Sequence, residues 1–204
     1  MKALNRLVDN MISSNILKSP LIIDAFRTID RKYFVPEEMI EDAYIDAPLP
    51  IGNYQTISQP STVAFMMERL DPKDGNTVLD IGSGSGWTTA LLCYMVGDKG
   101  SVTGVERVDT LVEQGSDNLS KFRFNSHCHI EKAGDKLGLP DKQFDRILVS
   151  AAAEEIPKEL FLQLKIGGIL VIPIGESIFK FTKISDTEVE KEEFYGFVFV
   201  PLIY

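Results

Sequence analysis

The sequence has few cysteines and no long apolar run, and each of these absences excludes a class of protein. Only Cys93 and Cys128 occur among its 204 residues, in segments that we interpret as a buried helix and a strand. Such residues usually serve as small core hydrophobes, so we expect neither a disulfide nor a redox pair. No apolar run approaches the ~20 residues of a membrane span, and the first residues are amphipathic, unlike a signal peptide. We therefore expect a soluble, cytoplasmic protein with no membrane partner.

Positive charge is also scarce, because 30 acidic residues outnumber 21 lysines and arginines and give a net charge of -9. No block of basic residues occurs, whereas binding to nucleic-acid phosphates depends on basic patches, so we expect no nucleic-acid partner. His127 and His129 alternate on a predicted strand without a surrounding cluster of metal ligands, so we expect no metal site. The length and ordinary composition suit a single domain, residues 1–204, and we expect a monomer.

The first part of the chain, residues 1–72, is expected to be a mainly helical layer. Leu4, Leu7, Val8 and Met11 have helical spacing. Ser19-Pro20 predicts the start of a second helix, with proline in its first turn. A third helix is expected to begin with Ser61 as its N-cap. Residues 32–52 are rich in proline and aromatics, which favours a packed irregular segment.

Strands and helices then alternate through residues 73–175. This order indicates a mostly parallel sheet covered on both faces. The expected strands are 77–81, 101–106, 127–133, 144–150 and 167–175, and the expected helices are 87–96, 110–122 and 156–164. In residues 176–204, FKFTKI alternates, TEVEKEE resembles a charged turn, and FYGFVFVPLIY is strand-like. We therefore expect antiparallel strands at the sheet edge.

The motif most closely tied to chemistry is VLDIGSGSGW, residues 78–87. Its glycines end a strand and precede a helix, which lets backbone N–H groups approach a ligand. A dinucleotide-binding loop is the alternative, but the spacing here is G-x-G-x-G, and Asp80 would repel a pyrophosphate. Glu106 ends the next strand, where a carboxylate can accept hydrogen bonds from both hydroxyls of a ribose. This combination favours S-adenosylmethionine over NAD.

Two further segments carry polar groups in positions that suit a ligand. Gly134-Asp135 follows the third expected strand, at the ligand side of an open sheet, where an aspartate can accept from an adenine amino group. GNYQTISQP, residues 52–60, gathers uncharged hydrogen-bonding side chains before a helix. The residue types alone leave open whether this loop is a plain connection or faces a ligand.

Taken together, these segments resemble the protein-L-isoaspartate (D-aspartate) O-methyltransferase family almost from end to end. The combination of QTISQP with LDIGSGSG carries the resemblance, which continues through RKYFVPEEM, GVER, AGD, FDRILVSAAAEEIPKEL and FVFVPL. The resemblance implies a Rossmann-like methyltransferase fold and S-adenosyl-L-methionine as methyl donor, leaving S-adenosyl-L-homocysteine. It also implies isoaspartyl-containing peptides and proteins as methyl acceptors, in the first step of their repair.

The resemblance assigns roles to matching residues of this chain. Ser58 falls on the family's active-site serine, with Thr56 beside it, and Gln59, Val198 and Phe199 are expected to contact the substrate. The residues expected to bind the cofactor are Asp80, Gly82, Ser83, Gly84, Glu106, Arg107, Gly134 and Asp135.

The chain departs from the family pattern at two places near the expected site. Tyr54 and Lys136 stand where the family usually has glycine, and we expect Tyr54 to narrow the entrance and Lys136 to add a side chain near the adenine. These departures leave two alternatives open: a related methyltransferase for another peptide carboxylate, and a cofactor-binding homologue without turnover. A nicotinamide dehydrogenase is disfavoured by the loop spacing and by Asp80.

Overall fold

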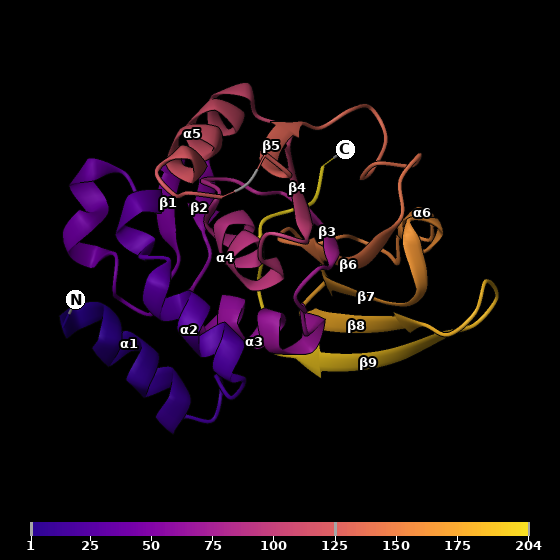
Figure 1. Ribbon diagram of the computed structural model, residues 1–204, viewed down its shortest axis with the longest axis horizontal. Helices are drawn as coiled ribbons and strands as arrows, with labels where there is room; N and C mark the ends of the chain where they lie inside the picture. The colour runs from indigo at the N-terminus through magenta and orange to yellow at the C-terminus, as the bar shows by residue number, and fades with distance from the viewer. Residues whose placement is uncertain (1, 125, 204) are drawn as a thin grey trace.

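The computed structural model describes residues 2–124 and 126–203, and its centre is a seven-stranded sheet (Figure 1). The strand order is β5-β4-β3-β6-β7-β8-β9; neighbours from β5 to β7 are parallel, and β8 and β9 pair antiparallel. The expected fold class is confirmed. The strands are β3 (Thr77–Ile81), β4 (Ser101–Glu106), β5 (Cys128–Lys132), β6 (Phe144–Val149), β7 (Leu164–Ile174), β8 (Ser177–Lys183) and β9 (Val189–Tyr195).

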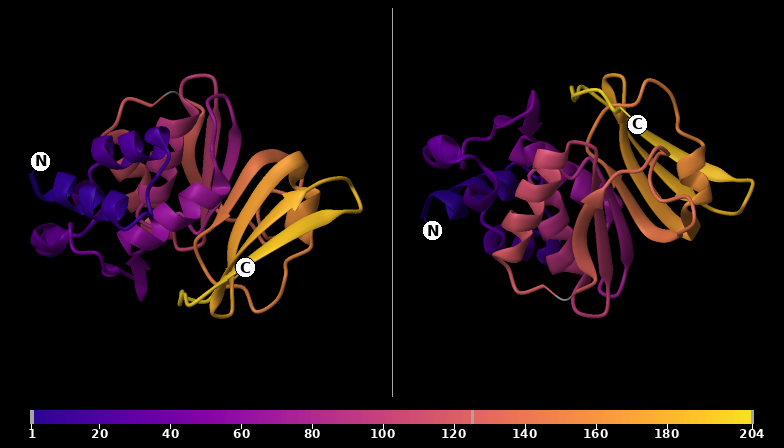
Figure 2. Two further views of the ribbon diagram at one scale, coloured as in Figure 1. Left: turned by 90° about the horizontal axis from the view of Figure 1, so that it is seen from below. Right: turned by 90° about the horizontal axis from the view of Figure 1, so that it is seen from above.

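Helices gather mainly on one face of this sheet, as Figure 2 shows. They are α1 (Lys2–Ser13), α2 (Pro20–Thr28), the 3-10 helices η1 (Arg31–Phe34) and η2 (Glu37–Asp42), α3 (Pro60–Leu70), α4 (Trp87–Val96), α5 (Asp109–Ser120) and α6 (Glu159–Leu162). Among the described residues, no helix has both the length and the apolarity needed to cross a membrane.

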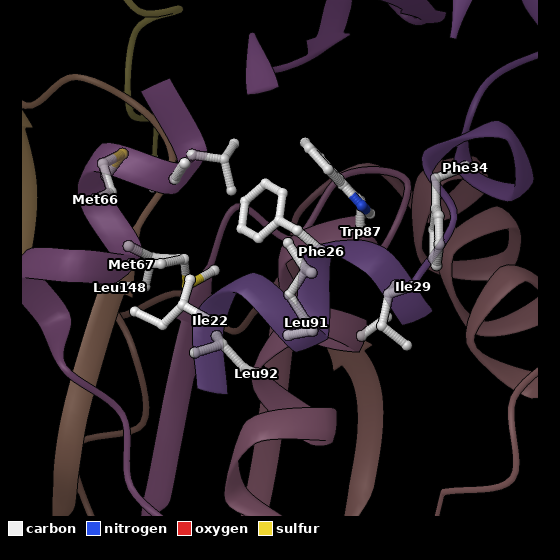
Figure 3. Packing of buried hydrophobic residues seen from close by; sticks show 14 of the residues in the cluster. Ile22, Phe26, Ile29, Phe34, Met66, Met67, Trp87, Leu91, Leu92 and Leu148 are labelled. Carbon is white, nitrogen blue, oxygen red and sulfur yellow. The ribbon is translucent and has the colours of Figure 1, made fainter. Parts of the chain in front are cut away.

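Alternate residues of the buried strands enter two apolar clusters, one on each face of the sheet. On β3, Val78 belongs to one cluster and Leu79 to the other. The first cluster joins α1 to α5, and there Phe26 of α2 meets Trp87 of α4 edge to face, with ring centroids 5.6 Å apart (Figure 3). The second contains Leu137 and Leu160, so connecting segments and the short α6 cover that face. Alternation therefore places the sheet between two cores.

The last helix was expected over residues 156–164, but α6 spans only Glu159–Leu162. Leu164 already belongs to β7, where it pairs with Phe144 of β6. Leu160 and Leu164 are both buried, and their spacing suits a helix as well as it suits a strand that begins after one turn. Sheet pairing decides between the two.

The N-terminal layer follows the expected order, with one correction at the start of α3. As expected, α2 begins with Ser19 at its N-cap and Pro20 at its first position. The prediction that Ser61 caps α3 is wrong, because Pro60 takes the first helical position and Gln59 precedes it. The Ser61 N–H instead donates to Asp46 Oδ1 at 2.8 Å. A residue distant in sequence thus supplies the acceptor that the helix start needs.

The segment expected to be irregular, residues 32–52, ends in the first strand of a β-hairpin whose second strand lies in the GNYQTISQP loop. The hairpin strands are β1 (Leu49–Gly52) and β2 (Gln55–Ile57), which pair antiparallel. The two turn residues, Asn53 and Tyr54, both have positive φ, 52° and 59°, as a tight two-residue hairpin turn requires. The Tyr54 side chain is fully exposed at the tip and does not line the cavity described below, so the expectation that it narrows the entrance is wrong.

The antiparallel C-terminal strands are present, but the boundary differs from the expectation. The charged stretch expected to be a turn lies mostly within β9, and the sheet ends at Tyr195. This strand is at the sheet edge and is largely exposed, a position where charged side chains prevent edge-to-edge association. After Gly196 (φ 104°) the chain leaves the sheet. FVFVPL is therefore a separate extended segment, with a single isolated bridge from Pro201 to Ala152.

Candidate active site

A cavity opens where the carboxyl ends of the parallel strands meet the hairpin and the C-terminal tail. Ligands of open α/β sheets bind at this edge. Three separate parts of the chain line the cavity: the hairpin, the loops that follow β3 to β6, and the tail. Its lining includes Ile51, Gln55, Thr56, Ser58, Gly82, Ser83, Gly84, Trp87, Glu106, Arg107, Gly134, Lys136, Ser150 and residues 200–203.

The glycine loop is held close to the sheet and to α5 by short contacts that only glycine permits. The N–H groups of Gly82 and Ser83 both donate to Val105 O, at 2.9 and 3.2 Å. Gly86 has φ 88°, and a Cβ there would lie 2.9 Å from Gly115 O. Gly115 is therefore needed within α5, because it makes room for the loop.

Glu106 supports this loop from the neighbouring strand. Its side chain is buried, its Oε2 accepts from Gly84 N at 3.1 Å, and its Oε1 accepts from Val108 N at 2.9 Å. Each carboxylate oxygen has a second lone pair, and Glu106 also lines the cavity. The same carboxylate can therefore shape the loop and accept hydrogen bonds from a ligand.

Asp80 lies beneath the loop and is not among the residues that line the cavity. It is fully buried, and its Oδ2 accepts from the hydroxyls of Thr88 and Thr89, each at 2.7 Å. Its Oδ1 has no hydrogen-bond partner among the described residues. Burial raises the pKa of Asp80 from 3.8 to about 6; the two threonine hydrogen bonds oppose this rise and the charge of Glu106 adds to it.

Replacing Asp80 with asparagine will stabilise the ligand-free protein at neutral pH. The raised pKa means that the folded chain binds more protons than the unfolded chain between about pH 3.8 and 6. Stability is therefore lost as the pH rises through this window, by about 3 kcal/mol at most. Asparagine can accept both threonine hydrogen bonds without ionising, so the variant should gain up to that amount at pH 7 and little at pH 4. Urea unfolding at both pH values measures the difference.

Asp145 provides the matched control. Its carboxylate is partly buried, which raises its pKa, but the hydrogen bond from Thr77 N–H and the ion pair with Lys165 outweigh this burial and lower the pKa. The Asp145 carboxylate therefore stabilises the folded protein at neutral pH, and this contribution is lost on acidification. Asp145→Asn should accordingly destabilise the protein at pH 7. An Asp80→Asn variant that is also less stable at pH 7 would contradict the interpretation of Asp80.

The segment after β5 is only partly directed at the cavity. Gly134 and Lys136 line it, whereas the exposed Asp135 does not. Lys136 thus adds a side chain at the cavity wall. Leu137 and Gly138 continue the wall beyond it.

The hairpin places two of its expected site residues at the cavity. Thr56 and Ser58 both line it, as alternate positions of an extended segment allow, and Gln55 does so as well, whereas Gln59 does not. The Ser58 hydroxyl has no hydrogen-bond partner among the described residues. It is therefore available to a ligand.

The tail approaches the cavity a few residues later than expected. Val198 is 89% exposed and Phe199 packs against the first apolar cluster, and neither lines the cavity. Residues 200–203 line it instead. Ala152 holds them there, because its N–H donates to Val200 O and its carbonyl accepts from Leu202 N, both at 2.8 Å.

Sequence reasoning missed two residues next to the site, Arg31 and Trp87. Arg31 is fully buried behind the hairpin, and its guanidinium carbon lies 5.3 Å from the centroid of the Trp87 ring. Trp87 begins α4 and lines the cavity. The arginine donates to backbone carbonyls, which every sequence contains, so no pattern of residue types could have identified its role.

Titratable groups outside this cavity give no sign of a metal centre. Among the described residues, no group of three His, Cys, Asp or Glu side chains lies close enough to hold a metal ion. His129 pairs with Glu131 on the surface, at 3.3 Å.

Comparisons with known proteins agree on one family. The sequence profile of the family described as protein-L-isoaspartate (D-aspartate) O-methyltransferase (PCMT) matches residues 2–204. The protein-L-isoaspartate O-methyltransferase of Methanopyrus kandleri is 38% identical over 207 residues, covering 99% of this chain and 92% of that protein. The Fervidobacterium nodosum enzyme of the same name is 42% identical over 185 residues, covering 89% and 92%.

A solved structure resembles this chain over almost its full length. It is the crystal structure of a Plasmodium falciparum protein assigned as a protein-L-isoaspartate O-methyltransferase, in complex with S-adenosyl-L-homocysteine. The TM-score is 0.88 at 26% sequence identity, and 98% of each chain is covered.

Proposed function

This chain belongs to the protein-L-isoaspartate (D-aspartate) O-methyltransferase family, and from that membership we propose how its cavity works. The enzyme transfers a methyl group from S-adenosyl-L-methionine to the free α-carboxyl of L-isoaspartyl residues in damaged proteins, which begins their repair. The residues that perform this reaction are the subject of the proposal.

The glycine loop and the residues around it fit the methyl donor, S-adenosylmethionine. Positive φ at Gly82, Gly84 and Gly86 brings the backbone close to the cavity, and the buried Ser83 hydroxyl has no hydrogen-bond partner among the described residues. Glu106 adds a carboxylate with unused lone pairs at the end of β4, the position that suits the two hydroxyls of a ribose. When bound, S-adenosylmethionine supplies an electrophilic methyl group on a positively charged sulfur.

Other residues of the proposed donor site act at its margins or from beneath. Gly134 and Arg107 line the cavity next to Glu106, and Lys136 adds a positive charge at the wall. Asp80 acts from below, where it anchors the start of α4 through Thr88 and Thr89. Asp135 lies outside the lining, so its proposed contact with the adenine amino group depends on a side-chain rotation.

Thr56 and Ser58 are proposed to orient the acceptor carboxylate. A carboxylate is ionised and already nucleophilic at neutral pH, so the site needs no strong general base. Its task is to align the carboxylate oxygen with the methyl group in a pocket containing little water. Neutral hydroxyls can do this without the tight ion pair that a lysine would form.

The hairpin and the tail are proposed to bracket the substrate peptide. Residues 200–203 form an extended segment along the cavity, and one of its edges is fixed by Ala152. On its other edge Pro201 has no N–H, so the Pro201 carbonyl and the backbone of Ile203 are the groups that can pair with an extended peptide. Gln59, Val198 and Phe199 lie just outside the cavity and are proposed to meet only the flanking parts of the peptide.

One observation carries this proposal: a glycine loop supported by Glu106 and the hydroxyls of the hairpin open into the same cavity. The donor and acceptor ends of a methyl transfer are thus adjacent. All three parts of the chain line this cavity, which supports residues 1–204 working as one unit and as a monomer. The acidic net charge favours a protein over a nucleic-acid acceptor, and the two free cysteines suit the cytoplasm.

A paired assay tests the function directly. The purified protein is given S-adenosylmethionine with a labelled methyl group and either an isoaspartyl peptide or its normal aspartyl twin. We expect base-labile label in the isoaspartyl peptide alone. Equal labelling of both peptides would indicate a methyltransferase for another carboxylate. Binding of S-adenosylhomocysteine without any labelling would indicate a homologue without turnover.

A further inference from the structure

Arg31 connects the acceptor side of the cavity with the donor side, although it does not line the cavity itself. We propose that Arg31 is a positioning residue for the methyl acceptor, which holds the segment carrying Thr56 and Ser58 in register with the helix that follows the glycine loop. The inference rests on the proposed function, because it concerns the alignment of that same acceptor.

The guanidinium binds two stretches of backbone that are distant in sequence. Its Nη1 donates to Ala43 O at 2.9 Å and to Ile45 O at 3.3 Å. Its Nη2 donates to Ala47 O at 3.0 Å, and also to Ser58 O at 3.1 Å and Ile57 O at 3.5 Å. One planar group therefore ties the connection before the hairpin to the end of β2. The Ser58 backbone is fixed while its hydroxyl stays unbonded.

The same group also contacts the donor side. Its guanidinium carbon lies 5.3 Å from the centroid of the Trp87 ring, a distance at which a cation is attracted to an indole face. Trp87 follows Gly86 directly, belongs to the first apolar cluster and meets Phe26 edge to face (Figure 3). Both Ser58 and Trp87 line the cavity. Arg31 therefore contacts one lining residue on the acceptor side and one on the donor side without lining the cavity itself.

The charge of Arg31 has no close counter-ion in the part of the chain that the structure describes. No carboxylate there lies within 4 Å of it, and Asp46 acts only from a distance. A buried cation held by carbonyl groups is a costly way to join two loops, because an apolar contact would do so without desolvating a charge. A positive charge behind Ser58 favours the negatively charged carboxylate that the site must hold. Geometry and charge thus point to the same role.

Substituting lysine for Arg31 separates this role from a general structural one. Lysine keeps the charge, but its single nitrogen cannot reach all the carbonyl groups that the two terminal nitrogens of the Arg31 guanidinium serve. We expect the KM for an isoaspartyl peptide to rise roughly 5- to 20-fold and kcat to fall, while the Kd for S-adenosylhomocysteine stays within about twofold. Hydrogen exchange should quicken in residues 43–58 and remain unchanged in the glycine loop, residues 82–86.

Arg69→Lys is the matched control. Arg69 also stacks on aromatic rings, with its guanidinium carbon 3.4 Å from the Phe65 centroid and 4.9 Å from that of Phe194, but it does not line or border the cavity. This variant should leave the peptide KM and kcat unchanged. If Arg69→Lys impaired the peptide kinetics as much as Arg31→Lys, the effect of replacing arginine with lysine would not depend on the position of Arg31, and the inference would fail.

Three other results would also overturn the inference. The first is unchanged peptide kinetics in Arg31→Lys, and the second is an equal loss of peptide and S-adenosylhomocysteine binding. The third is failure of both Arg31→Lys and Arg31→Gln to fold, which would assign Arg31 to the stability of the whole chain. A wild-type protein that does not methylate the isoaspartyl peptide would instead refute the proposed function, so the two failures are distinguishable.

Discussion

Replacing Glu106 with glutamine will weaken the binding of S-adenosylhomocysteine by about 10- to 150-fold, because one charge-assisted hydrogen bond contributes ~1.5–3 kcal/mol. Both oxygens of Glu106 already accept backbone hydrogen bonds, from Gly84 and Val108. Glutamine has one acceptor oxygen and one donor nitrogen, so one of these N–H groups would face another donor. We therefore expect the substitution to loosen the glycine loop and to remove the charge that is proposed to bind a ribose. Titration calorimetry measures the change.

Glu131→Gln is the control for this prediction. Glu131 lies on the neighbouring strand β5, is partly exposed and pairs with His129 at the surface, away from the cavity. Its substitution should leave the affinity unchanged. If Glu106→Gln binds S-adenosylhomocysteine as tightly as the wild-type protein, neither the charge of Glu106 nor its support of the loop contributes to donor binding.

The sheet and most of the residues lining the donor side of the cavity could be predicted because their signals are local, whereas Asp80 and Asp135 were expected there and do not line it. Parallel strands covered on both faces are short apolar runs, and ligands bind where those strands end. Glu106 and the glycines follow from these two facts alone. Alternation along a strand then places neighbouring residues such as Val78 and Leu79 in opposite cores.

The differences arise where distant contacts decide the structure. The edge position of the C-terminal strands was expected, but the charged stretch was predicted to be a turn; pairing with β8 makes it a strand, and charge is tolerated there because the strand is at the sheet edge. Leu164 starts a strand because Phe144 pairs with it. The tail approaches the cavity at residues 200–203, and not at Val198, because Gly196 turns the chain and Ala152 captures the segment beyond it.

Arg31 shows the same limit within the site. Its partners are five backbone carbonyl groups on two segments, and carbonyl groups leave no mark in a sequence. Only the fold brings those segments together around one side chain. The acceptor side of the cavity therefore depends on tertiary contacts more than the donor side does.

Replacing Ser58 with alanine will reduce methylation of an isoaspartyl peptide by roughly 10- to 150-fold, with little change in the binding of S-adenosylhomocysteine. The proposed hydrogen bond from the Ser58 hydroxyl orients a charged carboxylate, and a bond of this kind contributes ~1.5–3 kcal/mol. Because the lost bond positions the acceptor and not the donor, the change should appear in kcat/KM for the peptide. Single-turnover methylation at saturating donor measures it. Ser61→Ala, three residues away and outside the cavity, should retain wild-type activity.

The geometry of Ser58 already weakens the alternative that its hydroxyl only satisfies backbone groups in its own turn. Such a role requires a local hydrogen bond, and the Ser58 hydroxyl makes none among the described residues. The backbone of Ser58 is instead held by Arg31 through its carbonyl, at 3.1 Å. Ser58→Ala should therefore leave the loop and the midpoint of thermal unfolding unchanged while methylation falls. A variant that loses thermal stability and activity together would assign the hydroxyl to the loop, and unchanged methylation would leave Thr56 as the hydroxyl that orients the acceptor.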